Sequence, residues 1–204
     1  MQYFVTGATG FIGKRLVKTL LARKGAIVYF LLRPESENKV AALLEYWGVS
    51  KARAVPVYGD LTSKKLGVVA DDLKALKGKI DHLYHLAAVY DLSADEDSQV
   101  KVNIEGTRSA GEFAKAIEVK HFHHVSSIAA AGLYEGVFRE DMFDEAEGLD
   151  HPYFMTKHES EKIVRKECKV PWTVYRPAMV VGDSKTGEMD KIDGPYYFFK
   201  VIQR

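Results

Sequence analysis

A glycine-rich turn close to the amino terminus constrains the fold more than any other segment. A short apolar run at residues 3–6 leads into TGATGFIG, and an amphipathic helical pattern begins inside that motif. Glycines at this spacing allow a tight turn, let a diphosphate approach the backbone, and let a helix pack closely on the strand. Exposed amides and the positive end of the helix dipole favour phosphate. The turn therefore predicts a dinucleotide site formed by Thr6, Gly7, Thr9, Gly10, Phe11, Ile12 and Gly13.

Six short runs rich in β-branched and aromatic residues alternate with helical patterns along the chain, as βαβ units do. Most runs are almost continuously apolar, which is typical of strands covered by helices on both faces. Pro56 lies in the third run, and proline cannot donate to a central ladder, so this strand is expected at a sheet edge. We predict an α/β fold with a doubly wound parallel sheet of the Rossmann type, in the order 3-2-1-4-5-6. The predicted strands are residues 3–6, 26–32, 53–57, 80–86, 121–126 and 172–175.

Two longer helices and two irregular loops complete the predicted fold. Apolar spacing indicates a helix over residues 95–119, and another helix is expected to open at Pro152 and to run through Lys166. Loops at residues 129–150 and 181–197 each follow a strand. Because ligands bind outside the carboxyl ends of strands in open α/β sheets, these loops are expected to wall a substrate site.

Composition excludes several classes of function. Lys and Arg number 29 against 28 Asp and Glu, so no strong field draws the chain to nucleic acid or to an acidic membrane. Cys168 is the only cysteine, which excludes an internal disulfide and fits a reducing compartment. The start of the chain resembles no secretory leader, and no apolar run approaches the roughly 18 residues of a membrane span. We therefore expect a single cytoplasmic domain over residues 1–204, without an integral membrane segment.

Three histidines crowd the predicted fifth strand, but their pattern does not indicate a metal site. His121, His123 and His124 have no carboxylate or cysteine beside them at the spacing of metal ligands. The alternation of side chains along a strand places His121 and His123 on one face and His124 on the other. No bound metal is predicted.

Residues after the second and third predicted strands determine which dinucleotide binds. About 20 residues beyond the last glycine, an acid would accept hydrogen bonds from a free ribose 2′-hydroxyl. Arg33 occupies that position, and its guanidinium matches a 2′-phosphate, so we predict NADPH rather than NADH. Lys39 either adds a second positive charge there or is a solvated helix lysine. Asp60 either accepts the adenine amino group or caps the following helix. Other expected neighbours of the cofactor are Leu61, Ala87, Ala88 and Pro177.

A tyrosine and a lysine stand one helical turn apart at the start of the Pro152 helix. Tyr153 and Lys157 are spaced i, i+4, so their side chains project from one face. A phenol, with its pKa near 10, donates a proton poorly at neutral pH unless its anion is stabilised, and a nearby ammonium can supply that stabilisation. The pair Ser126 and Ser127 ends the preceding strand, at the sheet edge where a nicotinamide is expected. Together these residues indicate carbonyl chemistry.

The order of these motifs resembles that of the extended short-chain dehydrogenase/reductases. Members carry T-G-x-x-G-x-x-G, an acid after the third strand, a serine after the fifth strand, and Y-x-x-x-K. The resemblance implies Ser127 rather than Ser126 as the catalytic serine, because Ser127 lies five residues before Gly132 in an S-x-x-x-x-G arrangement. The catalytic set implied by the resemblance is Ser127, Tyr153 and Lys157, with Asn103 of an N-x-x-G-T segment in a structural or water-positioning role.

Within this group, the chain is most similar to bacterial fatty acyl-CoA reductases of the male-sterility type. The likeness rests on HLAAVYDL from residue 85, VSSIAAAG from residue 125, the acidic loop at residues 139–147, and GEMDKIDGPYYFF from residue 187. Family members continue well beyond the sixth strand. We therefore expect residues 1–204 to be the NADP-binding Rossmann domain of a longer reductase whose carboxy-terminal substrate region is largely absent.

The resemblance implies that NADPH reduces the carbonyl of a long-chain acyl-CoA or fatty aldehyde, which is a small-molecule partner. The aromatic residues 196–199 would either line an acyl channel or pack against the missing region. A nucleotide-sugar epimerase or dehydratase of the same family is an alternative, although such enzymes commonly retain NAD. A non-catalytic NADPH-binding sensor module is another alternative. No nucleic-acid motif is present, and a homo-oligomer is compatible with the sequence.

Overall fold

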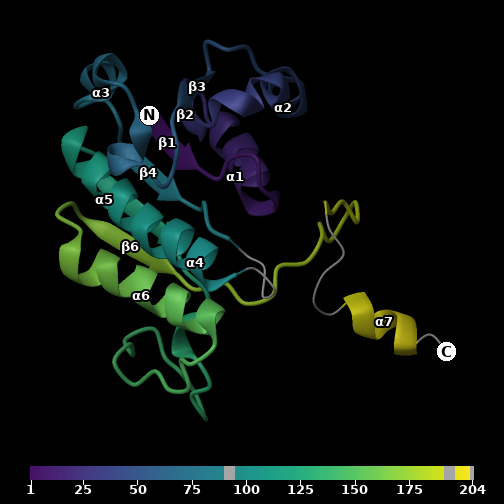
Figure 1. The fold of residues 1–204 in the computed structure, drawn as a ribbon. Helices are drawn as coiled ribbons and strands as arrows, with labels where there is room; N and C mark the ends of the chain where they lie inside the picture. The colour runs from purple at the N-terminus through teal and green to yellow at the C-terminus, as the bar shows by residue number, and fades with distance from the viewer. Residues whose placement is uncertain (90–94, 191–195, 203–204) are drawn as a thin grey trace.

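The computed structural model describes residues 1–89, 95–190 and 196–202. Its described strands form one parallel sheet in the order β3-β2-β1-β4-β5-β6, which confirms the predicted fold and topology (Figure 1). The observed strands begin and end within about two residues of the predicted ones, and the largest difference is β4, which is shorter at both ends. The strands are β1 (Gln2–Thr6), β2 (Ile27–Leu32), β3 (Ala54–Tyr58), β4 (His82–His85), β5 (His121–Val125) and β6 (Trp172–Tyr175).

Proline places β3 at the sheet edge, as predicted. Pro56 stands opposite Phe30 of β2, and β3 pairs with no other strand in the described part of the chain. An edge strand needs hydrogen-bond donors on one side only, so the missing proline N–H can face away from the ladder. Strand β1 lies between β2 and β4, so the carboxyl end of the first strand opens at the centre of the sheet.

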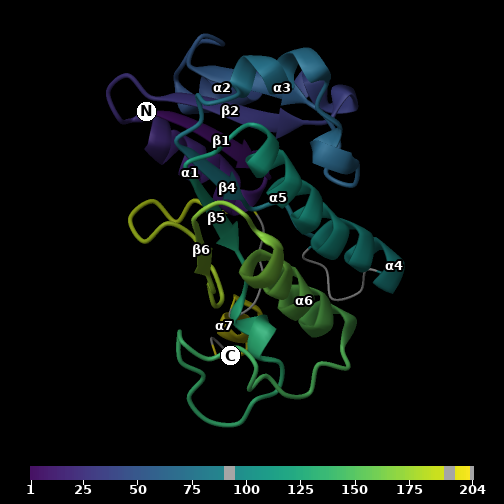
Figure 2. The same ribbon diagram turned by 90° about the vertical axis from the view of Figure 1, so that its left-hand side faces the viewer.

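Helices cover the two faces of the sheet in separate layers (Figures 1 and 2). The alternation along β1 shows the division, because Tyr3 and Val5 enter one core cluster and Phe4 enters the other. On the first face lie α1 (Phe11–Leu21) and α2 (Val40–Trp47). On the opposite face lie α3 (Ala70–Leu76), α5 (Gly106–Ala116) and α6 (Pro152–Glu167).

The helix predicted over residues 95–119 is three successive elements. It consists of α4 (Glu96–Gln99), a π-helical segment η3 (Val100–Glu105), and α5, which ends at Ala116. Glu118 adopts a left-handed φ of 56°, and this conformation ends the helix three residues before β5. A pattern that assumes 3.6 residues per turn does not reveal a π-helical segment, so the prediction of one continuous α-helix was wrong in this respect.

Short helical turns complete the described chain: η1 (Pro34–Lys39), η2 (Lys64–Gly67), η4 (Ile128–Ala131) and α7 (Tyr196–Ile202). Of the aromatic residues expected to line an acyl channel, Tyr196 accepts a hydrogen bond from the Gly182 amide at 2.8 Å, and Phe198 is exposed. The side chains of Tyr197 and Phe199 lie outside the described residues, as do positions 90–92 of HLAAVYDL and 191–195 of the second predicted loop. No helix in residues 1–89, 95–190 or 196–202 combines the length and apolar character that a bilayer crossing requires.

The histidines of β5 divide between the two faces of the sheet, as alternation predicted. The rings of His121 and His123 lie 4.5 Å apart on one face, whereas His124 stacks on His85 at 5.5 Å on the other. Burial lowers the pKa of His123 to about 4 and the pKa of His85 to about 3, so both rings are neutral near pH 7. Among the described residues, no group of three histidine, cysteine or acidic side chains is arranged to hold a metal ion.

Candidate active site

One cavity of about 290 Å³ joins the glycine-rich turn to the start of α6. It opens outside the carboxyl ends of β1, β4, β5 and β6, where ligands of doubly wound sheets bind. Ten of the residues predicted for the site line it: Gly7, Gly10, Phe11, Ile12, Gly13, Ala88, Ser127, Tyr153, Lys157 and Pro177. Its other lining residues were not predicted: Leu86, Val89, Val125, Ser126, Ala178, Met179 and Val180.

The glycine-rich turn has a backbone that requires glycine at two positions. Gly7 has a φ of 74°, and a Cβ added to it would lie 2.7 Å from the Ala87 amide nitrogen. A Cβ on Gly13 would lie only 2.0 Å from the Gly7 carbonyl oxygen. No side chain caps α1 at Gly10, so the first amides of the helix face the cavity beside Phe11 and Ile12. This arrangement fits the diphosphate of a dinucleotide.

The two threonines of the turn do not line the cavity. Thr6 is fully buried, where its Oγ1 accepts the Ala87 N–H at 3.2 Å and lies 2.8 Å from His85 Nδ1. Thr6 therefore links the end of β1 to the end of β4. Ala87 does not line the cavity itself, although its neighbours Leu86 and Ala88 do. Thr9 is exposed. Neither threonine lines the cavity, and their contacts with a cofactor stay a prediction.

Helix α6 brings Tyr153 and Lys157 together at the cavity. Pro152 occupies the first helical turn, and His151 Nδ1 accepts the Tyr153 N–H at 3.1 Å, so the helix begins where predicted. Both side chains are buried, and Lys157 Nζ donates to the Val125 carbonyl oxygen at 3.3 Å. Burial lowers the pKa of Lys157 to about 8, while the nearby Glu161 carboxylate opposes that change.

The two serines after β5 make different hydrogen bonds. Ser126 is buried, and its hydroxyl donates to Glu161 Oε2 at 2.8 Å. Ser127 Oγ accepts the Ala129 N–H at 3.1 Å, which leaves its own proton available on the cavity side. This geometry favours Ser127 over Ser126 as the donor to a substrate, and its catalytic role stays a prediction.

Asn103 lies behind the cavity wall and not in it. The residue is buried in η3, and its Oδ1 accepts the Val89 N–H at 2.8 Å while its Nδ2 donates to Thr156 Oγ1 at 3.2 Å. Val89 lines the cavity, and Thr156 stands on α6 between the tyrosine and the lysine. These contacts fit the structural role, one of the two that the resemblance implied, and the role of Asn103 stays a prediction.

Charged residues at the end of β2 form a separate, exposed group. Arg33 Nε lies 3.6 Å from Asp60 Oδ2, and the two side chains are 60% and 41% exposed. Asp60 Oδ1 accepts the Thr62 N–H at 2.7 Å and its hydroxyl at 2.6 Å; these hydrogen bonds and the Arg33 charge lower the pKa of Asp60. Lys39 is exposed at the end of η1, and Leu61 is a buried core residue. None of these four predicted cofactor residues lines the cavity.

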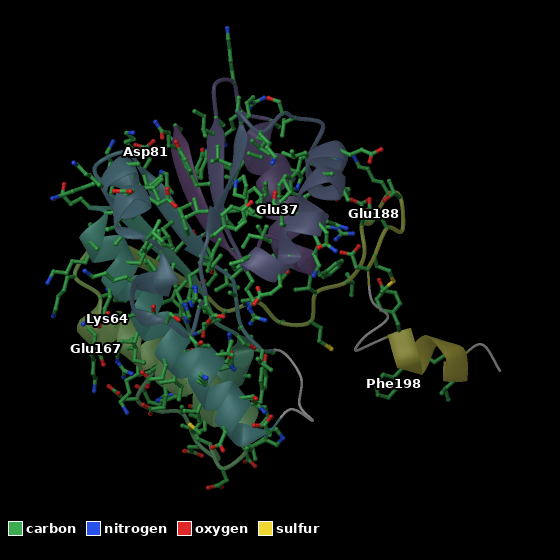
Figure 3. All side chains as sticks on the ribbon, turned by 45° about the horizontal axis from the view of Figure 1, so that its top comes forward. Glu37, Lys64, Asp81, Glu167, Glu188 and Phe198 are labelled. Carbon is green, nitrogen blue, oxygen red and sulfur yellow. The ribbon has the colours of Figure 1, made fainter. Side chains whose placement is uncertain are left out.

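The segment after β6 crosses the cavity and reaches α1. Residues 177–180 line the cavity, whereas no residue of the predicted wall at 129–150 does so. Farther along, Asp190 pairs with Lys14 at 2.9 Å and with Arg15 at 2.7 Å, and Glu188 pairs with Arg15 at 3.1 Å. Figure 3 shows Glu188 beside the helices of the first face. No described residue of the second predicted loop, at 181–197, lines the cavity either, so the wall after β6 is formed by residues 177–180, just before that loop.

Chemically, the cavity combines an uncapped helix start with a buried phenol, a buried amine and a serine hydroxyl. The amides suit a diphosphate, and the hydroxyl groups suit the oxygen of a carbonyl that gains negative charge. The residues present therefore fit a dinucleotide cofactor.

Comparison with known proteins identifies the group to which these features belong. A family model described as male sterility protein matches residues 5–204. One component of the linear gramicidin synthase of Brevibacillus parabrevis is 33% identical over 204 residues, which cover 93% of this chain and 4% of that protein.

Two solved structures are similar to the chain in fold and sequence. The terminal R domain from the myxalamid PKS-NRPS biosynthetic pathway has a TM-score of 0.80 and 31% identity, over 93% of this chain and 52% of that chain. UDP-glucuronic acid 4-epimerase from Bacillus cereus in complex with NAD has a TM-score of 0.69 and 28% identity, over 89% of this chain and 58% of that chain. The chain thus spans little more than half the length of these two structures.

Proposed function

Because the chain belongs to the male sterility protein family, within the extended short-chain dehydrogenase/reductases, we propose that it is the NADPH-binding part of a reductase for long-chain fatty acyl-CoA or fatty aldehyde. The observation that carries the proposal is the single cavity in which the glycine-rich turn, Ser127, Tyr153 and Lys157 meet. Family membership supports an oxidoreductase that uses a nicotinamide cofactor. The acyl-CoA substrate rests on the resemblance of the motifs quoted above.

In this proposal the chain's own residues receive the charge that develops on the substrate oxygen. NADPH, when bound, supplies the hydride that attacks the carbonyl carbon. Ser127 and Tyr153 donate hydrogen bonds to the oxygen, and the Tyr153 proton transfers to it. The Lys157 ammonium stabilises the phenolate that remains. Loss of the thiol from the resulting thiohemiacetal gives an aldehyde, and a second reduction gives an alcohol.

Arg33 supports NADPH over NADH, since its guanidinium stands at the end of β2 and is largely exposed to an incoming ligand. Lys39 on η1 would add positive charge beside the same 2′-phosphate. Asp60 forms an ion pair of 3.6 Å with Arg33, and the Arg33 side chain is still 60% exposed.

The test is to mix the full natural polypeptide with NADPH or NADH and a series of substrates, and to follow loss of the reduced nicotinamide absorbance. The series contains acyl-CoA thioesters of increasing chain length, fatty aldehydes and a UDP-sugar. We expect turnover of a thioester or aldehyde with NADPH, and a lower KM for NADPH than for NADH. Cofactor binding without any turnover would contradict the proposal and support the sensor module.

The second candidate is a nucleotide-sugar epimerase, which similarity to the UDP-glucuronic acid 4-epimerase favours. The two candidates differ in their use of the cofactor, since an epimerase returns its nicotinamide to the starting oxidation state within each cycle. In a further reaction supplied with NAD⁺, a change in the UDP-sugar without net formation of NADH would therefore replace the proposal with this one.

A further inference from the structure

A fully buried carboxylate lies one helical turn beyond Lys157, and no role has been assigned to it above. Glu161 is 0% exposed and is bound by two arginines and a serine. Its Oε1 accepts from Arg165 Nε at 2.8 Å and from Arg176 Nη2 at 2.7 Å. Its Oε2 accepts from Arg176 Nε at 3.0 Å and from Ser126 Oγ at 2.8 Å. A carboxylate held by this many donors has a fixed orientation.

The partners of Glu161 stand directly beside residues that line the cavity. Ser126 precedes Ser127 at the end of β5, and Arg176 precedes Pro177 after the end of β6. Glu161 itself follows Tyr153 and Lys157 on α6 at intervals of four residues, so all three side chains lie along one side of the helix. One carboxylate therefore joins the catalytic helix to two strand ends.

Arg176 extends the connection to the loop that follows β5. Its Nη2 donates to the Met142 carbonyl oxygen at 2.8 Å, and its Nη1 donates to the Arg139 carbonyl oxygen at 3.3 Å. The guanidinium also lies over the Phe138 ring, 5.1 Å from the centroid. A lysine has neither this flat shape nor enough donors to make the same contacts.

Glu161 is also the anion that balances the buried amine of Lys157. Within the described part of the chain, the titratable groups that interact electrostatically with Lys157 include Glu161 on α6, His85 on β4 and His124 on β5. Burial holds the pKa of both histidines far below the usual range, so they are neutral and supply no compensating charge. Without Glu161, Arg165 and Arg176 would lose the carboxylate that they share, and Lys157 would lose the negative charge that raises its pKa.

We propose that Glu161 is a positioning residue of the active site, which holds the strand ends that carry Ser127 and Pro177 against the helix that carries Tyr153 and Lys157. Arg176 is its partner in this role, and Arg165 is not, since Arg165 makes no hydrogen bond to a strand end within the described residues. The inference deepens the proposed reductase function and rests on it. A displacement of about 1 Å at such a site can lower a rate by about 100-fold.

The first test compares Glu161→Gln with Glu159→Gln, a control with the same change at a partly exposed glutamate of the same helix. We expect kcat of Glu161→Gln to fall by about 100-fold, with a much smaller change in the dissociation constant of NADPH. If Lys157 must be charged, activity declines as the pH rises through its pKa. Loss of the neighbouring carboxylate should move this decline to lower pH by about one unit.

A second comparison separates positioning from general stability. Arg176→Gln and Arg165→Gln each remove one guanidinium from the same carboxylate, but only Arg176 is attached to the cavity wall. We expect a large loss of kcat from Arg176→Gln and a small loss from Arg165→Gln. Equal losses of kcat from the two variants would overturn the inference.

If Glu161→Gln fails to fold, Ser126→Ala keeps every charge and is expected to lower kcat by about 10-fold, through loss of one hydrogen bond to a charged group. Wild-type kcat in that variant would also overturn the inference.

A readout without turnover distinguishes failure of this inference from failure of the proposed function. The Lys157 amine is titrated by NMR in the cofactor-free protein, where its pKa is about 8. In Glu161→Gln this pKa should be lower, and in Glu159→Gln it should be unchanged. A wild-type protein that reduces no substrate contradicts the function alone. An unchanged Lys157 titration in a folded Glu161→Gln protein contradicts the inference alone.

Discussion

The two ends of the candidate site hold their charges in different ways. At the end beside α6, Lys157 and Glu161 are buried and bound by donors or acceptors from three elements. At the end that would bind the adenosine, Arg33 and Asp60 are largely exposed and form a single ion pair of 3.6 Å. Buried charges are costly to maintain and strongly coupled, whereas exposed charges are screened by water. The buried end is therefore expected to govern rate and stability, and the exposed end to govern the choice of cofactor.

The largest expected effect is at the buried phenol. Tyr153→Phe removes the proposed proton donor without removing the ring that packs beside the cavity. We expect kcat to fall by about 10²–10⁴-fold, the contribution typical of general acid catalysis, while NADPH affinity stays near normal. Stopped-flow measurement of NADPH oxidation gives the turnover rate, and fluorescence titration of cofactor binding gives the NADPH affinity. Tyr134→Phe, in the loop after β5, is the control. A Tyr153→Phe protein with wild-type activity would contradict the expectation that the buried end governs the rate.

The next largest effect is on stability. Substitution of Lys157 is expected to stabilise the fold although it removes activity. The folded-state pKa of Lys157 is about 8, below the unfolded value, so its buried ammonium destabilises the fold fully below pH 8. As pH rises from about 8 towards the unfolded value near 10.4, the unfolded state binds more protons and this cost disappears. Lys157→Met should therefore raise the free energy of unfolding at pH 7 by about 1–3 kcal/mol while abolishing turnover.

Urea denaturation measures this change, and Lys162→Met, at a partly exposed lysine of the same helix, is its control. The stability gain of Lys157→Met over wild type should shrink between pH 8 and pH 10. A variant that is less stable than wild type at pH 7 would show that the buried amine stabilises the fold, contrary to the comparison.

A smaller effect is expected at the exposed end. Arg33→Ala should raise the KM for NADPH by about 10–100-fold through loss of charged hydrogen bonds, with little change for NADH. The melting temperature should not change, because the ion pair with Asp60 is exposed to solvent. Arg139→Ala, which removes a similarly exposed ion pair with Asp141, is the matched control. Equal losses with both cofactors would contradict a role in selecting the 2′-phosphate.

Substitution of Lys39 is expected to give the smallest change in NADPH binding. Its comparison with Arg33→Ala tests which cation at the exposed end is the main contact. The exposed Lys39 side chain would contact the 2′-phosphate through water or at long range, so Lys39→Ala should weaken NADPH binding by only about 2–5-fold. Added salt should reduce this difference further, since screening weakens exposed charges. Isothermal titration at two ionic strengths tests the prediction. A loss as large as that from Arg33→Ala would show that the lysine, and not the arginine, is the main contact.

Much of the fold could be predicted because its signals are local. The turn that ends at Gly13, the edge strand with Pro56, and the i, i+4 pair at Tyr153 are each contained in a few consecutive residues. Strand order then followed from the rules of doubly wound sheets. These features explain why the lining of the cavity was predicted in large part.

The features that were missed depend on partners distant in sequence. Glu161 and Glu159 are both acids on one helix, and only tertiary contacts with Ser126 and Arg176 distinguish the buried acid from the partly exposed one. The loops at residues 129–150 and 181–197 each follow a strand, as site walls do, yet no described residue of either loop lines the cavity. Composition and spacing do not record which side of a helix or loop another segment will cover.

The contact between Gly7 and the Ala87 amide has a consequence for transplanting the first strand, turn and helix into another protein. The obstacle to any side chain at position 7 is main chain contributed 80 positions later, so no choice of residue at position 87 would relieve it. A host sheet can accept this N-terminal unit only if the main chain at the end of its own neighbouring strand lies equally close to the turn. The binding turn is therefore a property of two strands, and it cannot be moved as a single cassette.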